Sequence, residues 1–236
     1  MPGFLYVVAT PMGNLADITL RGIEVLKNSA LVLCENPANS ASLFKQYNIS
    51  TPKTRLYSSM TPKDFLPFIR QMQEGNDIAL ISDAGTPGIS DPGSSFIRFA
   101  REKNVTIKPV PGASALSAIM SVCGFQTNPT VFMGFLSEKK NKKREQLVNL
   151  QPFERLIVIY ETIYKLETTL EMIVSLFPDS ELVIGRELTK IHEEILYISD
   201  VGNFSINSLT KKGEFVLLIN NFRKKISKAK LGMADR

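Results

Sequence analysis

The pattern of apolar and polar residues alternates between short strand-like runs and amphipathic helical segments in the first half of the chain. Each apolar run ends at a break rich in Gly, Pro, Asn or Ser, which is typical of a buried strand that ends in a loop. Asp17 is placed to cap the first helix. The alternation of strands and helices favours an α/β fold with a mostly parallel sheet covered on both faces. The runs are FLYVVAT (4–10), ALVLCE (30–35), DIALISD (77–83) and VTIKPV (105–110).

The second half has more strands per helix than the first. A long helical pattern, LETTLEMIVSLF (166–177), lies among strand-like runs. We therefore predict two domains with a boundary near residues 110–114: an N-terminal αβ domain over residues 1–112, and a C-terminal αβ domain with a basic tail over residues 113–236. The strand-like runs are RLIVIYE (155–161), ELVIGREL (181–188), EEILYIS (193–199) and EFVLLIN (214–220).

The segment SDAGTPGISDPG (82–93) directly follows one of the predicted strands. Its glycines permit a positive φ or a close approach, and its prolines stiffen the loop. Ligands of parallel sheets bind beyond the carboxyl ends of the strands, where this loop, PMGN (11–14) and PGAS (111–114) are predicted to lie. Neither GxGxxG at the required position nor GxxxxGK[ST] occurs, so the loops suit a ligand other than a nucleoside triphosphate. Asp83 could bind that ligand or cap a loop.

Composition narrows the class of protein. Hydrophobic residues make up 44% of the chain, but no apolar run approaches the roughly 18 residues that span a bilayer. The N-terminus carries no export signal. The two cysteines, Cys34 and Cys123, and the single histidine, His192, are too few for a disulfide framework or a zinc pair. We expect a cytoplasmic protein without a metal site or a membrane segment.

The net charge of +5 is concentrated in two segments, EKKNKKREQ (138–146) and FRKKISKAK (222–230). Clustered Lys and Arg side chains can neutralise phosphates, as nucleic-acid-binding proteins do. A solvated loop and a frayed tail would have the same composition. The charge pattern alone leaves both interpretations open.

Seven segments taken together resemble one known family. The order of these segments, over residues 4 to 220, is similar to that in the tetrapyrrole methylase superfamily. The resemblance is strongest to its ribosomal RNA branch, the small-subunit ribosomal RNA (cytidine-2′-O)-methyltransferase I family. The segments are ATPMGNLADITLRGIEVL, SDAGTPGISDPG, PVPGASALSAIMSVCGF, FMGFL, VIYET, GRELTK and GEFVLLIN.

The resemblance implies two αβα domains, a homodimer, and S-adenosylmethionine held in the cleft between the domains. It also implies ribosomal RNA or the small ribosomal subunit as the substrate. Met133 could instead be a core residue, and Ser114 a helix N-cap. By position, the donor-binding residues would be Pro11, Gly13, Asp83, Ala84, Gly85, Ser90, Ser114, Ala115, Met133 and Gly134.

Methyl transfer to a ribose hydroxyl needs orientation and a base for the hydroxyl proton, but no metal. Carboxylates and lysines near strand ends could serve, and the available set is Glu35, Glu161, Glu187 and Lys190. We favour Glu35 and Glu187 as catalytic residues. Surface ion pairs, for instance with Arg186 or Lys190, would equally explain these glutamates.

One departure from the family bears on the substrate. Where the ribosomal RNA branch has Glu-Asp-Thr-Arg after the second strand, this chain has Glu35-Asn36-Pro37-Ala38. Two alternatives therefore stay open: methylation of a tetrapyrrole or another small molecule, and a donor-binding or RNA-binding relative without catalysis. The favoured function is ribose 2′-O-methylation of small-subunit ribosomal RNA. Its predicted phosphate contacts are Lys139, Lys140, Lys142, Lys143, Arg144 and the tail from Arg223 to Lys230.

Overall fold

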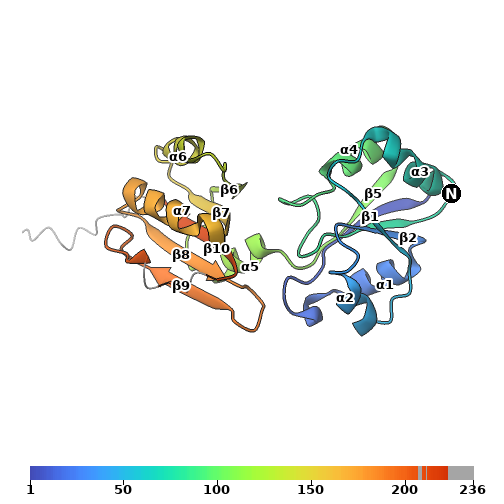
Figure 1. Cartoon of the computed structure of the whole chain (residues 1–236), viewed down its shortest axis with the longest axis horizontal. Coiled ribbons are helices and arrows are strands. Elements are labelled where there is room, and N and C mark those ends of the chain that lie inside the picture. The colour runs from blue at the N-terminus through green and yellow to red at the C-terminus, as the bar shows by residue number, and fades with distance from the viewer. Residues whose placement is uncertain (207–208, 211, 223–236) are drawn as a thin grey trace, which may run out of the picture. The chain divides into compact units, whose positions relative to one another are not determined.

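The chain divides into two compact units, each with its own five-stranded sheet (Figure 1). The computed structural model describes residues 1–206, 209–210 and 212–222. The first unit comprises Met1–Ser121 and Glu187–Glu193, and the second comprises Val122–Arg186 and the described residues from Glu194 onward. The predicted α/β class is confirmed.

The first unit contains a sheet of five strands in the order β3-β2-β4-β1-β5, and every neighbouring pair is parallel. Parallel order places the carboxyl ends of all five strands at one edge, as the strand and helix alternation predicted. The strands are β1 (Phe4–Val8), β2 (Leu31–Cys34), β3 (Lys53–Arg55), β4 (Ile78–Leu80) and β5 (Thr106–Val110). The helices are α1 (Leu20–Asn28), α2 (Ala41–Gln46), α3 (Pro62–Gln73), α4 (Ser94–Glu102) and α5 (Ala115–Val122).

Helices cover both faces of this sheet, with α3 and α4 on one side and α1 and α2 on the other (Figure 1). Successive side chains of a strand point to opposite faces. On β2, Leu33 accordingly packs with the phenylalanines of α3 and α4, whereas Val32 and Cys34 pack with Leu26 of α1 and Phe44 of α2. The central strands are therefore buried on both faces and read as continuous apolar runs.

The start of α1 differs from the prediction that Asp17 caps it. A short 3₁₀ turn, η1 (Leu15–Asp17), comes first, and the side chain of Asn14 caps this turn through the Ala16 N–H at 3.1 Å. The cap of α1 is Thr19, whose hydroxyl accepts from the Gly22 N–H at 3.0 Å. Asp17 ends the preceding turn, so its carboxylate is not at the helix terminus.

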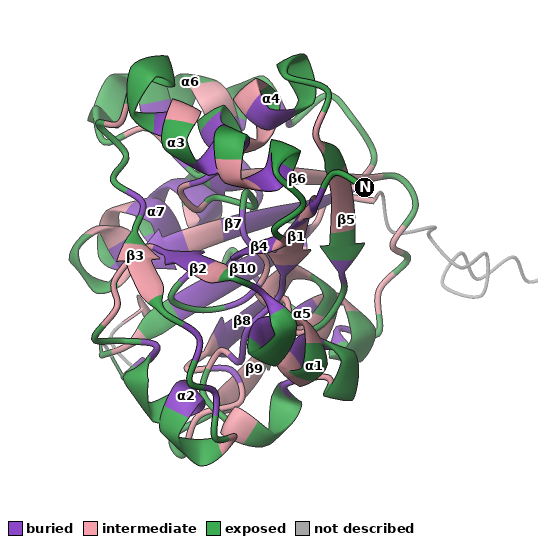
Figure 2. Cartoon of the chain, turned by 90° about the vertical axis from the view of Figure 1, so that its right-hand side faces the viewer, coloured by how far each residue is buried: buried purple, intermediate pink, exposed green. Residues whose placement is uncertain are grey.

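The second unit contains a mixed sheet in the order β6-β7-β10-β8-β9. Only β6 and β7 are parallel, and the other neighbouring pairs are antiparallel. The central strands of both sheets are mostly buried, whereas the edge strands and the outer faces of the helices are partly or fully exposed (Figure 2). The elements are β6 (Thr130–Phe135), α6 (Lys140–Val148), β7 (Leu156–Thr162), α7 (Ile163–Leu176), β8 (Glu181–Arg186), β9 (Glu194–Ile198) and β10 (Glu214–Asn220).

The edge strand β6 contains a bulge at Met133. Phe132 is paired with Val158 and Gly134 with Ile159, so Met133 is the extra residue. As a result, the rings of both Phe132 and Phe135 contact Tyr160, with centroids 4.9 and 5.8 Å away. Met133 itself packs against the apolar core of the second unit, which agrees with the core position considered for it.

Candidate functional site

Three loops meet beyond the carboxyl ends of the strands of the first unit. Thr10, after β1, and Gly85, after β4, form a main-chain bridge with N–H to carbonyl distances of 2.8 and 2.9 Å. The Thr10 hydroxyl also donates to the Ser82 carbonyl at 3.1 Å. The Thr86 hydroxyl donates to the Ala113 carbonyl, after β5, at 3.1 Å. These bonds join the loops that the sequence predicted to form a ligand site.

The glycine-rich loop needs its glycines for backbone conformation. Gly85, Gly88 and Gly93 have φ values of 80°, 81° and 119°, and Ser90 also has a positive φ of 64°. A Cβ atom built on Gly85 would meet no heavy atom closer than 3.8 Å. The restriction at Gly85 is therefore the left-handed conformation and not the available space.

Gly13 is needed for a close approach. A Cβ atom on Gly13 would lie 2.3 Å from Cγ of Lys190 and 3.0 Å from Oγ1 of Thr189. Both residues belong to Glu187–Glu193, the segment between β8 and β9 that is part of the first unit. Gly13 therefore lets this distant segment pack on the loop after β1.

Glu187 and Lys190 form an ion pair within that segment, with Nζ 2.9 Å from Oε1. The side chains are 20% and 30% exposed, respectively. Glu187 and Thr189 both have positive φ, 50° and 66°. The Thr189 hydroxyl oxygen is buried and has no hydrogen-bond partner among the described residues. The segment thus brings a carboxylate, an ammonium and an unsatisfied hydroxyl to the first unit.

A pocket of about 280 Å³ lies between the loops after β1, β2 and β4. Of the predicted donor-binding residues, it is lined by Pro11, Gly13 and Asp83. Its walls combine hydroxyl, amide and carboxylate groups with apolar side chains, a surface that suits a polar organic ligand. The lining residues are Thr10, Pro11, Met12, Gly13, Leu15, Asn39, Ser40, Ser42, Leu43, Ser82 and Asp83.

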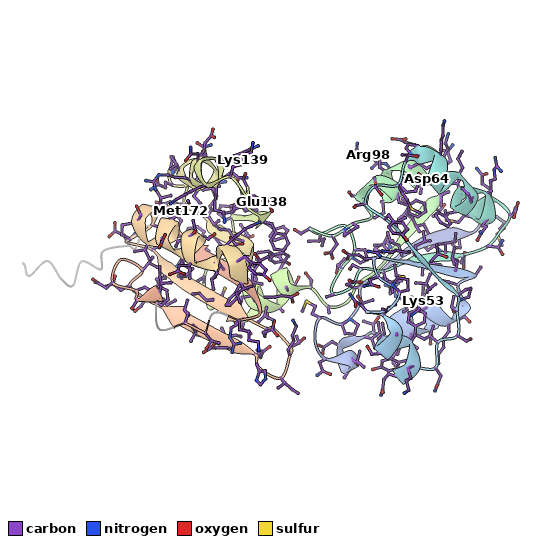
Figure 3. The ribbon with its side chains drawn as sticks, viewed as in Figure 1. Lys53, Asp64, Arg98, Glu138, Lys139 and Met172 are labelled. Atoms are coloured by element: carbon purple, nitrogen blue, oxygen red, sulfur yellow. The ribbon has the colours of Figure 1, made fainter. Side chains whose placement is uncertain are left out.

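Asp83 holds the loop that follows β2. Its carboxylate accepts from the Asn36 N–H at 3.1 Å and from the Asn39 side-chain amide at 2.6 Å. From β3, Lys53 donates to the Pro37 carbonyl at 2.8 Å and to the Ser40 hydroxyl at 3.2 Å (Figure 3). Hydrogen bonds from Asp83, after β4, and from Lys53, on β3, therefore fix the position of the Glu35-Asn36-Pro37-Ala38 turn.

Glu35 directly follows β2 and lies beside Asp83. Burial raises the pKa of the Glu35 carboxyl, and the nearby negative charge of Asp83 raises it further. A backbone hydrogen bond from Asp83 and the charge of Arg55 act in the opposite direction. A carboxylate with a raised pKa is a better proton acceptor than an ordinary surface glutamate.

The other predicted donor-binding residues fall into two groups. In the first unit, Ala84 and Ser90 are exposed, Gly85 is buried, and Ser114 and Ala115 are half-buried around the start of α5. Met133 and Gly134 lie on β6 in the second unit. The first unit thus contains Pro11, Gly13, Asp83, Glu35 and the Glu187 segment. Met133 and Gly134 belong to the second unit.

The basic run after β6 forms a helix, not the loop that the solvated-loop interpretation assumed. Lys140 to Val148 are α6, and Lys139 is its N-cap (Figure 3). Lys143 is a correction to the predicted phosphate contacts, because only 3% of its side chain is exposed and its ammonium is paired with Glu161. We call Lys139, Lys140, Lys142 and Arg144, which are all exposed, the α6 cations. The basic tail from Arg223 to Lys230 lies outside the described residues.

Sequence reasoning missed the polar residues on the β2 side of the pocket, Asn39, Ser40 and Ser42. The signal that could have found them is the run NPANSAS, which places five small polar or turn-forming residues directly after a buried strand. Among the described residues, no cluster of His, Cys, Asp and Glu could hold a metal ion. None of the helices in that part of the chain combines the length and hydrophobicity that a membrane span requires.

Comparison with solved structures identifies the fold as that of a class of methyltransferases. A uroporphyrin-III C-methyltransferase from Thermus thermophilus matches with a TM-score of 0.66 at 15% identity, over 93% of this chain and 94% of that one. A second structure of that Thermus enzyme, complexed with S-adenyl homocysteine, matches with a TM-score of 0.62 at 14% identity, over 92% and 97% of the two chains.

The sequence comparisons are more specific than the fold. The model of the tetrapyrrole (corrin/porphyrin) methylases matches residues 4–204, and the chain belongs to this family. The chain is also 50% identical to "Ribosomal RNA small subunit methyltransferase I" of Leptospira biflexa over 224 residues, which are 95% of this chain and 93% of that protein. The suspected family is confirmed, and the chain is a methyltransferase.

Proposed function

We propose that this protein transfers a methyl group from S-adenosylmethionine to small-subunit ribosomal RNA, at a ribose 2′-hydroxyl. The observation that carries the proposal is the 50% identity, over 95% of the chain, to a methyltransferase named for that RNA. The tetrapyrrole methyltransferases of the same fold are only about a third as similar, at 14 and 15% identity. The RNA substrate is therefore better supported than a small molecule.

The donor site that we propose uses the joined loops of the first unit and two residues of the second. Positive φ at the exposed Ser90 can turn main-chain groups toward a ligand, whereas the left-handed Gly85 uses its own main-chain groups to join the loops through Thr10. The complex of a protein of this fold with S-adenyl homocysteine is consistent with this ligand class. The proposed contacts are Pro11, Gly13, Asp83, Ala84, Gly85, Ser90, Ser114, Ala115, Met133 and Gly134.

We propose Glu35 as the base. The ribose oxygen forms a bond to the methyl carbon as the carbon–sulfur bond breaks, and the hydroxyl proton passes to the Glu35 carboxylate. Its raised pKa makes this carboxylate the more basic for that step. Glu187 is the second proposed catalytic residue, and its ion pair with Lys190 at 2.9 Å fixes the two groups as a unit. This chemistry needs orientation and no metal.

The remaining parts of the proposal concern assembly and place. The α6 cations supply phosphate contacts, because they are exposed on one polar helix. We also propose that the two units correspond to the two predicted domains, that the protein is a homodimer in the cytoplasm, and that two-fold pairing enlarges the surface for a large RNA. Light scattering at micromolar concentration tests the dimer, and a species of only 26.3 kDa would exclude it.

The deciding experiment is methyl transfer to purified small ribosomal subunits from cells that lack this gene. With labelled S-adenosylmethionine and a chelator present, we expect one ribose methyl group, which mass mapping locates in the RNA. The Glu35→Gln variant is the matched control for contaminating activity. Transfer to a tetrapyrrole but not to RNA, or donor binding with no transfer at all, would overturn the proposal.

A further inference from the structure

Helix α6 is attached to the second unit by very few buried side chains. Its sequence, KNKKREQLV, is almost entirely polar, and only Lys143 and Leu147 are buried in it. These two residues are four apart and therefore lie on one face of the helix. One of these two buried side chains is thus a charged group in the protein interior. The half-buried Gln146 adds one hydrogen bond at the protein surface, because its Oε1 accepts from the Ser137 N–H at 2.8 Å.

The Lys143 ammonium lies in a closed network of hydrogen bonds. Its Nζ is 3.0 Å from Oε2 of Glu161, at the end of β7, and 2.7 Å from Oγ1 of Thr169, in α7. The Thr169 hydroxyl donates in turn to the same Glu161 oxygen. The other Glu161 oxygen accepts from the Thr162 N–H at 2.9 Å, where α7 begins. We call Lys143, Glu161 and Thr169 the buried triad.

All three residues of the buried triad are removed from water, with whole-residue exposures of 2% for Lys143, 3% for Glu161 and 0% for Thr169. The attraction between buried charges is largely offset by the loss of their hydration, so such a pair contributes little net stability. Its hydrogen bonds are directional, however, whereas an apolar contact such as that of Leu147 permits rotation and sliding. The buried triad therefore determines how α6 is oriented more than how strongly it is held.

From these contacts we infer that the buried triad is a positioning device for RNA binding. It fixes the rotation of α6 about its own axis, and so presents the α6 cations as one ordered set of phosphate contacts. Lys143 acts through the helix and not on the RNA. This inference rests on the proposed function, because it assigns the α6 cations an RNA ligand.

An apolar replacement of the whole triad separates orientation from stability. Lys143→Met, Glu161→Met and Thr169→Val together leave no unpaired buried charge, and such replacements of buried ion pairs often preserve or increase stability. We expect the triple variant to melt at or above the wild-type temperature. We expect the amides of α6 to exchange with deuterium roughly tenfold faster, because a nine-residue helix that has lost its directional anchors to β7 and α7 unfolds locally more often.

RNA binding gives the second measurement on the same variant. With α6 misoriented, fewer cations reach phosphates at once, so the log–log salt slope should become shallower by roughly 0.7–0.9 for each phosphate that is no longer neutralised. Affinity for S-adenosylmethionine should stay the same. If the triad served only stability, the well-folded triple variant would bind RNA with the wild-type slope, and this result would overturn the inference.

A control and a milder variant complete the design. Lys165→Met removes the neighbouring exposed pair, in which Lys165 Nζ is 2.7 Å from Glu138 Oε1, and should change neither exchange in α6 nor the slope (Figure 3). If the triple variant fails to fold, Thr169→Val alone keeps the ion pair and should shift both measurements in the same direction, by less. Unchanged deuterium exchange in α6 of the folded variant would refute the inference, whether or not the wild-type protein binds RNA. Absence of RNA binding by the wild-type protein would by itself refute only the proposed function.

Discussion

The loops of the first unit and helix α6 of the second are held in place in different ways. The loops are joined largely through main-chain groups, as in the bridge between Thr10 and Gly85. Helix α6 is held through side chains that come from β7 and α7, 18 and 26 residues further along the chain. Hydrogen bonds between main-chain groups depend on the local backbone conformation, which glycines and prolines in the sequence indicate. Hydrogen bonds between side chains depend on partners that only the fold brings together.

Gly85→Val should have the largest effect on ligand binding, because it disturbs the main-chain bridge between Thr10 and Gly85 directly. Valine strongly disfavours the φ of 80° at this position. We expect loss of detectable donor binding by calorimetry, with the fold retained. Gly124→Val is the matched control, because Gly124 also has a positive φ, 70°, and an open space around it, but lies in the other unit. Equal loss of binding in both variants would contradict a local role for Gly85.

Glu35→Gln tests the proposed base. We expect turnover to fall by roughly 10²–10⁴-fold, with little change in donor affinity. The pH dependence of stability has a definite sign. Since the pKa of Glu35 is raised by folding, the native state binds more protons than the unfolded state, and the carboxyl costs stability as pH rises above its ordinary pKa. The variant should therefore be more stable than wild type at neutral pH and lose this advantage in acid.

Thermal melts across the pH range and single-turnover rates provide these data. Glu102→Gln, at an exposed position at the end of α4, is the control and should leave both unchanged. A wild-type rate in Glu35→Gln would exclude Glu35 as the base and direct attention to the Glu187 segment.

Reversing all four α6 cations to glutamate tests the surface that α6 presents. If each cation contacts a phosphate, the salt slope for RNA should become shallower by a total of about 3. Donor binding should be unaffected. The control reverses four exposed cations of α3 and α4 in the first unit, which changes the net charge equally: Lys63, Arg70, Arg98 and Arg101. A slope equally reduced by both sets would indicate a general charge effect in place of an α6 interface.

Asn39→Ala should have the smallest effect. It removes the hydrogen bond to Asp83 in the loop after β2 and should cost only about 1 kcal/mol of stability. Asn203→Ala is closely matched, since the Asn203 amide donates to the carboxylate of Asp200 at 2.8 Å, also at an exposed position. We expect similar melting temperatures but a raised KM for RNA only in Asn39→Ala. An unchanged KM for RNA in Asn39→Ala would show that the β2 side of the pocket takes no part in binding the RNA.

The sequence predicted the strands and loops of the first unit well because their signals are local. The run DIALISD and the glycines after it specify a buried strand and a left-handed turn within a few residues. The cap of α1 was wrong by two residues, because Asn14 forms an extra 3₁₀ turn that uses Asp17. A residue able to cap a helix can be recognised from the local sequence. Where a 3₁₀ turn directly precedes the helix, the local sequence does not show to which of the two elements that residue belongs.

The chemical environment of Lys143 could not be predicted in this way. Within KNKKREQLV, nothing local distinguishes Lys143 from Lys142, yet the first is buried and the second exposed. The spacing of Lys143 to Leu147 indicates one helix face, but the reason that a lysine is tolerated there is Glu161 on β7. The pocket lining is similar, because Asn39 and Asp83 are 44 residues apart in sequence and meet only through the parallel order of β2 and β4.

The bulge at Met133 has a consequence for the chain lengths that this fold accepts. Because Met133 has no counterpart on β7, deleting it would remove the bulge and leave Gly134 paired with Ile159 and Phe135 with Tyr160. The residues on both sides of the bulge would keep their register. A relative with a one-residue gap at this position would therefore keep the aromatic contact, and its strand should be read with an unbroken inward and outward pattern.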